Sequence, residues 1–599
     1  MFKKVLILLL FLGSHPLFAE PFPPPLTPIT IAYPDPGATL SVSTATFILG
    51  SIIPSTGTFR INGQIVKPHR NGGFLAYLPI PSLPAGKQPA EFVFHCELQY
   101  QNTTYTLDHK IRIFSLQTPP TTQIFIDPNF LLPNEAMELN PGDWLDVRLR
   151  GTPGAEGEWS LSGVKKHLPL FEMENSGIYR GSYQIQPGDK AKEAEVEFSL
   201  KHKDLGKTRE TSKGKVTIPS EPFRVVEVSS ELAQGETGPG NSYFMFVKKG
   251  TRLLMNGRQG KKLRAFLSET ESAWFDSGAF QILPEGYIHP RTTLEHINTS
   301  VSDNSTIVSL SLGSPVPYSI EPTPEGLELK LYYTQARTTF MTYDSKDTFV
   351  QNIQWKQIGR QTCVVSIRLS SKETLWGYHV SLKPGSLNLE LKRAPRLKPR
   401  PSSVFAGLKI ILDPGHSPRT SPPWDGAVGP HGTQEPIATL ALAKNLKALL
   451  EKAGAQVVMT RSGEEEVAIY ERPKIAWENR GDLFISLHYN AIPDGTNPFE
   501  KTRGFSVFYY HAHSLALAQS IHRAYLRRHS LPDEGLRYGN LVVSRISQMP
   551  AVLVESAYLI FPEQEELITS RRFQTKIAIA LLEGAKNFLE KERNKQQKK

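Results

Sequence analysis

The sequence contains very little cysteine, with only two such residues in 599. Cys96 and Cys363 are far apart and fall in different predicted modules. We therefore expect both to be buried small apolar residues and not the two halves of a disulfide. Neither follows the N-terminal apolar segment, which excludes a lipid-modified cysteine as the first residue after processing.

Long apolar runs are also missing. After the N-terminus, no segment approaches the roughly 20 consecutive apolar residues that a membrane-spanning helix needs. The N-terminus has two lysines, a short apolar run at 5–12 and then Ala19, which is the layout of a secretory signal peptide at 1–19. We expect an exported protein, periplasmic or associated with the cell wall, without a transmembrane segment once the signal is cleaved. A retained N-terminal anchor is the alternative.

Neither sign of charge is in large excess. Lysine and arginine number 68 against 58 acidic residues, which gives a formal net charge of +10. A basic protein favours an anionic partner, such as nucleic acid, a membrane surface or a bacterial cell wall. The sequence has no recognisable element that reads nucleic acid, and export argues against that partner, so we predict none.

Short alternating strands dominate the chain before residue 395. The length is too great for one hydrophobic core, and the 47 prolines suit many strands and turns joined by stiff linkers. Asn62-Gly63, for example, is the dipeptide that a type I′ hairpin turn prefers. We predict four all-β modules, at 20–115, 116–221, 222–288 and 289–394. A basic, proline-rich linker at 395–403 then follows, which we expect to be a solvated, semi-rigid spacer; an additional contact with the anionic wall is the alternative.

From residue 404 the pattern changes. Continuous apolar strands near 408–412, 483–488 and 551–555 alternate with helical stretches. This predicts an α/β domain at 404–590 with a largely parallel sheet flanked by helices, followed by a frayed polar tail at 591–599. The predicted fold class is therefore multidomain: several all-β modules followed by one C-terminal α/β domain.

Polar side chains follow the strands of this domain at the points where the strands end. His416, His488 and Glu555 each come at or shortly after the end of a predicted strand, and Glu435 begins a helix after the loop 425–429. Functional sites in open α/β sheets gather at the carboxyl ends of the strands. We therefore expect two histidines and two carboxylates to meet at one edge of the sheet.

This set of side chains has a chemical meaning. Two imidazoles, one carboxylate and an open fourth position form a catalytic zinc site. The second carboxylate is then free to accept a proton from water. Taken singly, each residue also has a structural interpretation, as a satisfied polar residue at a strand end or a salt-bridge partner. Their joint placement favours the metal site.

The residues also form a known pattern. In order, it comprises Asp413-Pro-Gly-His416, Gly426-Ala-Val-Gly429, Glu435, Thr460-Arg461, Arg472, Asn479, Ser486-Leu-His-Tyr-Asn-Ala491 and Pro550-Ala-Val-Leu-Val-Glu555. This pattern resembles the zinc-dependent N-acetylmuramoyl-L-alanine amidases of the Amidase_3 type. The resemblance implies that His416, Glu435 and His488 bind Zn²⁺ and that Glu555 is the catalytic carboxylate. It also places Arg461, Arg472, Asn479 and Asn490 on motif positions that either orient substrate or make structural hydrogen bonds.

The implied reaction is hydrolysis of the amide bond between N-acetylmuramic acid and L-alanine in peptidoglycan, for wall remodelling, division or turnover. Peptidoglycan is then the main partner, with activator proteins of the wall or the division machinery as further partners. Two alternatives stay open. One is a different zinc amide hydrolase, such as a wall-peptide carboxypeptidase. The other is a non-enzymatic wall-binding protein, against which the intact set of four residues argues.

The sequence departs from the family pattern around these residues. Residues 417–424 are extra, and His431 lies four residues before Glu435. His431 is therefore an alternative ligand, but the motif position favours Glu435. After Glu555 the family often has Gly-Phe-Ile-Ser-Asn, whereas this chain has Ala557-Tyr-Leu-Ile-Phe561, so we expect different local substrate contacts. Only a short loop follows Ala491, so the self-blocking helix of some relatives is not expected. Four further histidines, at 511, 513, 522 and 529, are expected at the surface.

The upstream modules have resemblances of their own. The module at 20–115 resembles the immunoglobulin-like modules of exported bacterial enzymes, and the one at 116–221 is predicted to be a second β-sandwich. The short module at 222–288 resembles a small SH3-like barrel. The module at 289–394 resembles the AMIN module, a β-sandwich that attaches amidases to the wall or its assembly machinery.

Overall fold

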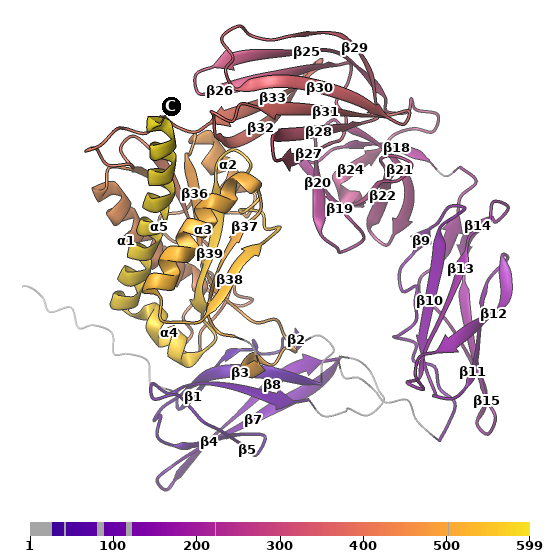
Figure 1. Ribbon diagram of the computed structural model, residues 1–599. Coiled ribbons are helices and arrows are strands. Elements are labelled where there is room, and N and C mark those ends of the chain that lie inside the picture. The colour runs from indigo at the N-terminus through magenta and orange to yellow at the C-terminus, as the bar shows by residue number, and fades with distance from the viewer. Residues whose placement is uncertain are drawn as a thin grey trace, which may run out of the picture.

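The computed structural model describes residues 27–40, 44–80, 89–114, 122–221, 223–500 and 502–598. The expected signal peptide lies outside these residues. Over the described residues, β-rich regions precede a C-terminal domain of strands and helices, which confirms the predicted fold class (Figure 1). None of the helices in the described ranges is long and apolar enough to cross a bilayer.

The first β region consists of two sheets that share one apolar core. Its strands are β1 (Ile29–Tyr33), β2 (Thr39–Leu40), β3 (Ala45–Ile52), β4 (Thr58–Ile61), β5 (Gln64–Val66), β6 (Gly73–Pro79), β7 (Ala90–Tyr100) and β8 (Thr103–Ile113). Asn62 and Gly63 have φ values of +49° and +77° between β4 and β5, as the predicted type I′ turn requires. Cys96 is a free, fully buried residue of this core, as predicted.

The second β region contains a six-stranded antiparallel sheet over a core around Trp159. The strands of the region are β9 (Met137–Glu138), β10 (Trp144–Arg150), β11 (Glu156–Leu161), β12 (Lys165–Glu172), β13 (Ile178–Gln184), β14 (Ala191–Ala194), β15 (Val196–His202), β16 (Gly206–Thr211) and β17 (Val216–Ile218). The strands β9, β14 and β17 belong to a different sheet, which continues into the next region. The second and third regions are therefore hydrogen-bonded to each other.

The third β region completes that shared sheet. Its elements are β18 (Arg224–Val228), β19 (Leu232–Glu236), β20 (Tyr243–Lys248), β21 (Arg252–Gln259), β22 (Lys262–Phe266), β23 (Ser272–Asp276), the short 3-10 helix η1 (Ser277–Ala279) and β24 (Phe280–Ile282). Strand β21 pairs with β9 of the second region. Its apolar residues pack in one cluster with those of the fourth region, so these two regions share a core.

The fourth β region has two antiparallel-rich sheets. Its strands are β25 (Thr292–Ser302), β26 (Ser305–Leu312), β27 (Tyr318–Thr323), β28 (Gly326–Tyr332), β29 (Thr334–Thr342), β30 (Val350–Ile358), β31 (Thr362–Leu369), β32 (Leu375–Lys383) and β33 (Ser386–Arg393). Cys363 is free and fully buried here, as predicted. The Trp376 indole N–H donates to the Asp482 carbonyl at 2.7 Å, which attaches this region to the α/β domain where β36 begins.

The α/β domain is built on a six-stranded sheet in the order β35-β34-β36-β39-β37-β38. Its strands are β34 (Lys409–Pro414), β35 (Gln456–Met459), β36 (Leu483–Asn490), β37 (Phe505–Tyr509), β38 (Asp533–Tyr538) and β39 (Ala551–Tyr558). Its helices are α1 (Glu435–Lys452), α2 (Glu471–Glu478), η2 (Pro498–Glu500), α3 (Ala512–Arg528), α4 (Pro562–Thr569) and α5 (Arg571–Gln597). Only the β37–β39 pair is antiparallel in the described sheet, so the sheet is largely parallel as predicted.

The C-terminal helix corrects one expectation. Helix α5 continues to Gln597, so the prediction of a frayed tail is wrong for most of residues 591–599. Arg593, 3% exposed, donates to the Ser402 carbonyl at 2.9 Å, and the Gln596 amide donates to the Pro395 carbonyl at 3.0 Å. These bonds hold the linker along the helix, while seven of its nine residues, 395–403, are exposed to solvent.

Candidate metal centre

The carboxyl ends of three neighbouring parallel strands form the candidate site. Strand β36 lies between β34 and β39, and His488 on β36 is the register partner of Glu555 on β39. His416 comes two residues after the end of β34, and Glu435 is the first residue of α1. The structure therefore brings all four residues to the edge of the sheet where the sequence predicted them.

Three of these residues form a cluster that could hold a metal ion. One nitrogen from each of His416 and His488 and one oxygen of Glu435 all lie within 4.8 Å of one another. The Glu435 carboxylate is 3.4 Å from His416 Nε2 and 3.0 Å from His488 Nδ1. Its side chain is only 4% exposed, whereas that of His416 is 30% exposed, so the cluster is reached from the His416 side.

Backbone geometry makes this close approach possible. A Cβ atom on Gly415 would lie 2.3 Å from the His488 ring, and one on Gly426 would lie 2.7 Å from a Glu435 oxygen. Gly426 also has a φ of +93°, and His416 itself has a φ of +59°. Any side chain at these two glycines would therefore push the cluster apart.

Asp425 supports His416 from the side away from Glu435. This contact was not predicted from the sequence. His416 Nδ1 donates to Asp425 Oδ1 at 2.8 Å, so Nε2 is left free to bind a metal ion. Burial favours the neutral carboxyl, but the hydrogen bond from His416 holds the pKa of Asp425 below its usual value. The available signal was a carboxylate in the loop between His416 and Glu435.

Asp413 is the centre of a buried network behind the cluster. It is fully buried and accepts hydrogen bonds from the hydroxyls of Thr460 and Ser486 at 2.6 Å each. Arg472 donates to it at 2.7 Å and to the His416 carbonyl at 2.9 Å. Burial favours the neutral form, but the Arg472 charge overrides it and holds the pKa of Asp413 below its usual value.

The side chains of the other predicted residues, Arg461, Asn479 and Asn490, make hydrogen bonds to different parts of the domain. Arg461, 1% exposed, donates to the carbonyls of Gly415 at 3.1 Å and Pro436 at 2.6 Å, so it joins the loops that carry His416 and Glu435. Asn479 donates from its side chain to a carbonyl of its own helix, at Ile475. Asn490 accepts from the backbone N–H of Ala491 with its side-chain oxygen.

Glu555 differs from Glu435 in its electrostatic environment. Burial raises the pKa of Glu555 well above its usual value, and the negative charge of Glu435 raises it further. Burial acts in the same direction on Glu435, but the hydrogen bond from His488 and the charge of His416 hold the pKa of Glu435 below its usual value. Glu555 Oε2 is buried and has no hydrogen-bond partner among the described residues. One carboxylate is therefore kept anionic, while the other accepts a proton readily.

His431 lies outside the metal cluster. Its Nδ1 donates to Glu565 at 2.8 Å and its Nε2 donates to the Asn71 carbonyl at 3.1 Å, so both ring nitrogens are engaged elsewhere. The four later histidines correct another expectation, because they are partly buried and not surface residues. Burial lowers the pKa of both His511 and His529 to about 4.

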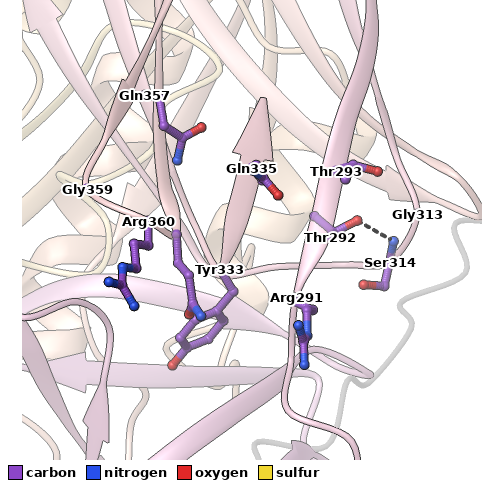
Figure 2. A pocket seen from close by; sticks show the side chains of 11 residues that line it. Arg291, Thr292, Thr293, Gly313, Ser314, Tyr333, Gln335, Gln357, Gly359 and Arg360 are labelled. Atoms are coloured by element: carbon purple, nitrogen blue, oxygen red, sulfur yellow. Dashed lines mark hydrogen bonds between the residues drawn. The ribbon is translucent and has the colours of Figure 1, made fainter. Parts of the chain in front are cut away.

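A cavity of about 770 Å³ lies in the fourth β region (Figure 2). Arg291, Arg360 and Tyr333 are among its lining residues, and the Ser314 N–H donates to the Thr292 hydroxyl at 3.1 Å. None of the described residues that line it is a histidine, cysteine or carboxylate. It lacks the groups of a metal centre, so the candidate site remains the edge of the α/β sheet.

Comparison with known proteins agrees with this site. Residues 410–587 match the family described as N-acetylmuramoyl-L-alanine amidase. A probable cell wall amidase LytH of Staphylococcus saprophyticus is 30% identical over 231 residues, which cover 38% of this chain and 72% of that protein. A second LytH, from Staphylococcus epidermidis, is 33% identical over 31% of this chain and 60% of its own length. The amidase AmiC2 of Nostoc punctiforme has a solved structure that is 31% identical, covering 31% of this chain and 99% of that one, with a TM-score of 0.28.

Proposed function

Because the chain belongs to the N-acetylmuramoyl-L-alanine amidase family, we propose that it is a zinc-dependent hydrolase of the amide bond between N-acetylmuramic acid and L-alanine in peptidoglycan. The observation that carries this proposal is the cluster of His416, Glu435 and His488 beside Glu555, whose buried Oε2 has no hydrogen-bond partner in the described parts of the chain. A metal ligand set and a separate proton acceptor are the two requirements of metal-assisted hydrolysis.

The donor set fits Zn²⁺, which binds imidazole nitrogen and carboxylate oxygen and keeps one position open in catalytic sites. His416 would offer Nε2, because Asp425 holds its Nδ1. His488 would offer Nδ1 and Glu435 one carboxylate oxygen, since these are the atoms that face each other. Zinc held there supplies Lewis-acid chemistry, which polarises the scissile carbonyl and lowers the pKa of water.

Glu555 is the proposed general base and acid. It takes a proton from water as the water oxygen forms a bond to the lactyl carbonyl carbon. It then returns that proton to the departing nitrogen of L-alanine as the C–N bond breaks. The products are a lactyl carboxylate on the glycan and a free amine on the stem peptide. The raised pKa of Glu555 suits a group that must hold the proton between these two steps.

Arg461 and Arg472 are proposed as positioning residues. Both are buried, and both donate to backbone carbonyls of the loop that carries His416. Neither side chain needs to touch substrate for this role. Asn479 lies four residues before β36 begins, at the opposite edge of the sheet from the site, and bonds to its own helix at Ile475, so it has a structural role. Asn490, at the carboxyl end of β36, keeps a proposed role in orienting substrate.

The upstream regions are proposed to bind the cell wall after export, with 1–19 as a cleaved signal peptide and wall or division proteins as activators. The module boundaries at 115/116, 221/222, 288/289 and 394/395 remain proposals. Since the third and fourth regions share one core, any deletion should remove both together.

Digestion of purified sacculi by the full-length enzyme tests the proposed reaction. New lactyl carboxylates and new N-terminal L-alanine, lost with a chelator and restored by zinc, support the amidase. New peptide carboxylates would instead identify a wall-peptide carboxypeptidase. Binding to sacculi without the formation of any new carboxylate or amine would instead indicate a non-enzymatic wall-binding protein.

A further inference from the structure

An apolar cluster joins the first β region to the α/β domain, far along the chain. It consists of Phe47, Leu49 and Leu75 from β3 and β6 together with Ile492, Tyr558, Ile560 and Phe561. All seven side chains are buried, at 0–8% exposure. Figure 1 shows the first region lying against the α/β domain near α4.

Strand alternation explains how the first region supplies this surface. Ile48 belongs to the region's own core, whereas its neighbours Phe47 and Leu49 lie on the opposite face of β3 and pack against the α/β domain. On β6, Phe74 faces the core and Leu75 faces the domain in the same way. The region therefore has one apolar sheet face in excess of its own core, and the α/β domain covers it.

The α/β half of the cluster comes from the ends of two neighbouring strands, with Ile492 after β36 and Tyr558, Ile560 and Phe561 at or after the end of β39. Ile560 and Phe561 are 4% and 1% exposed. Without the first region these apolar side chains would lose the cover of Phe47, Leu49 and Leu75. The two apolar surfaces are therefore complementary.

Polar contacts surround the apolar cluster. The Tyr33 hydroxyl donates to Asp494, and the Tyr77 hydroxyl donates to the Gly495 carbonyl at 3.2 Å. Asp494 and Gly495 belong to the loop that follows β36, which carries His488. The first β region therefore holds in place the loop that follows the predicted ligand His488.

A second set of contacts reaches the loop before Glu435. The Asn71 carbonyl accepts from His431 Nε2 at 3.1 Å, and a Cβ on Gly73 would come within 2.9 Å of the His431 ring. Glu565, 2% exposed, holds the other side of the loop through His431 Nδ1 at 2.8 Å. The loop is thus clamped between α4 and the first β region.

Three of the four segments that carry predicted site residues contact the first region: the Glu435 loop through His431, the segment after His488 through Ile492, and the segment after Glu555 through Tyr558. We propose that the first β region is a fixed part of the amidase active site, which positions these segments, and that His431 is a positioning residue. This rests on the proposed function. A region that only targeted the enzyme to the wall would need no contact with these segments.

The test uses the full-length protein and a substrate that needs no wall binding, a soluble N-acetylmuramoyl dipeptide. Leu49→Asp with Leu75→Asp places two charges in the docking face and leaves Ile48 and Phe74 in the region's core. Ile65→Asp, on a side chain that is 69% exposed in the same region, is the matched control. Small-angle X-ray scattering reports whether the region is released.

If the double variant releases the first β region, we expect its kcat on the dipeptide to fall by about tenfold or more with little change in KM, because the reacting groups lose their alignment. Zinc should also pass to a competing chelator about tenfold faster, since the Glu435 loop is no longer held. The control should stay within about twofold of the parent in both measurements.

Other outcomes overturn the proposal. A double variant that stays docked would show that this cluster does not hold the region. If the region is released and kcat stays at the parental value, the first β region is only a tether. If kcat rises on release, the first β region covers the site as a lid. If the parent itself forms no lactyl carboxylate, the proposed function fails together with this inference; if the parent is active, only the inference is at risk.

Discussion

His431 lies 2.8 Å from Glu565, and both nitrogens of its ring donate hydrogen bonds, Nδ1 to this carboxylate and Nε2 to the Asn71 carbonyl. Only the protonated imidazolium can donate from both nitrogens at once. In agreement, the hydrogen bond to Glu565 raises the pKa of His431. The contact between the first β region and the α/β domain therefore includes a titratable group.

The first prediction concerns pH. Because the folded pKa of His431 is raised above the unfolded value of about 6.5, its contribution to stability is complete below that value and is lost as the pH rises through the raised folded pKa. The thermal unfolding midpoint of the parent should therefore fall, over that pH window, relative to that of His431→Gln. Parallel midpoint curves for the two proteins would show that His431 is not protonated in the fold.

Asp425 should control zinc affinity without being a ligand. Asp425→Asn keeps the size of the side chain but weakens the hold on His416 Nδ1. We expect the zinc affinity to fall by about 10- to 100-fold, the usual effect of losing such a partner. Competition with a fluorescent chelator measures this, with Glu464→Gln on the exposed surface as the control. An unchanged affinity would remove Asp425 from the metal centre.

Arg472 and Lys474 lie on the same short helix and should differ sharply in their effect on stability. Arg472→Ala leaves the fully buried Asp413 without its cation, which costs about 3–5 kcal/mol of unfolding free energy. Lys474 pairs with Glu471 in solvent, so Lys474→Ala should cost less than about 1 kcal/mol. Denaturant unfolding of both variants gives the comparison. Similar losses would mean that the Asp413 network does not stabilise the domain.

The site could be predicted from the sequence because local structure, the end of a strand or the start of a helix, places each of its residues. Parallel strands deliver whatever follows them to one edge, so His416, His488 and Glu555 could be placed from strand ends alone. Glu435 was found in the same way, since a helix that starts at this edge brings its first residue there. The type I′ turn at Asn62-Gly63 likewise depends on two adjacent residues.

What could not be predicted depends on contacts between distant residues. Nothing near Phe47 or Leu75 shows that this strand face is covered by Phe561, and nothing near His431 shows that it contacts Asn71. The tail was expected to fray because it is polar, but Arg593 is buried by hydrogen bonds to linker carbonyls that periodicity cannot show. Such pairings are fixed by tertiary packing and not by the local pattern.

Mutations of the proposed metal ligands and of the proposed proton acceptor should have different effects on zinc content. His416→Ala and His488→Ala each delete a proposed ligand, so zinc content and activity should fall together. Glu555→Gln keeps the size of the side chain but cannot accept a proton. It should therefore keep near-stoichiometric zinc and lose about 10²-fold or more in kcat, the scale of general acid–base catalysis.

Zinc content by elemental analysis and kcat on the soluble dipeptide decide between the roles of the two carboxylates. Glu435→Gln should lose zinc, because Glu435 Oε1 and Oε2 face His488 and His416. Glu555→Gln should not, because its buried Oε2 has no partner among the described residues. Near-parental turnover by Glu555→Gln would remove it as the base. Zinc loss in that variant would instead make Glu555 a ligand, and the two carboxylates would exchange roles.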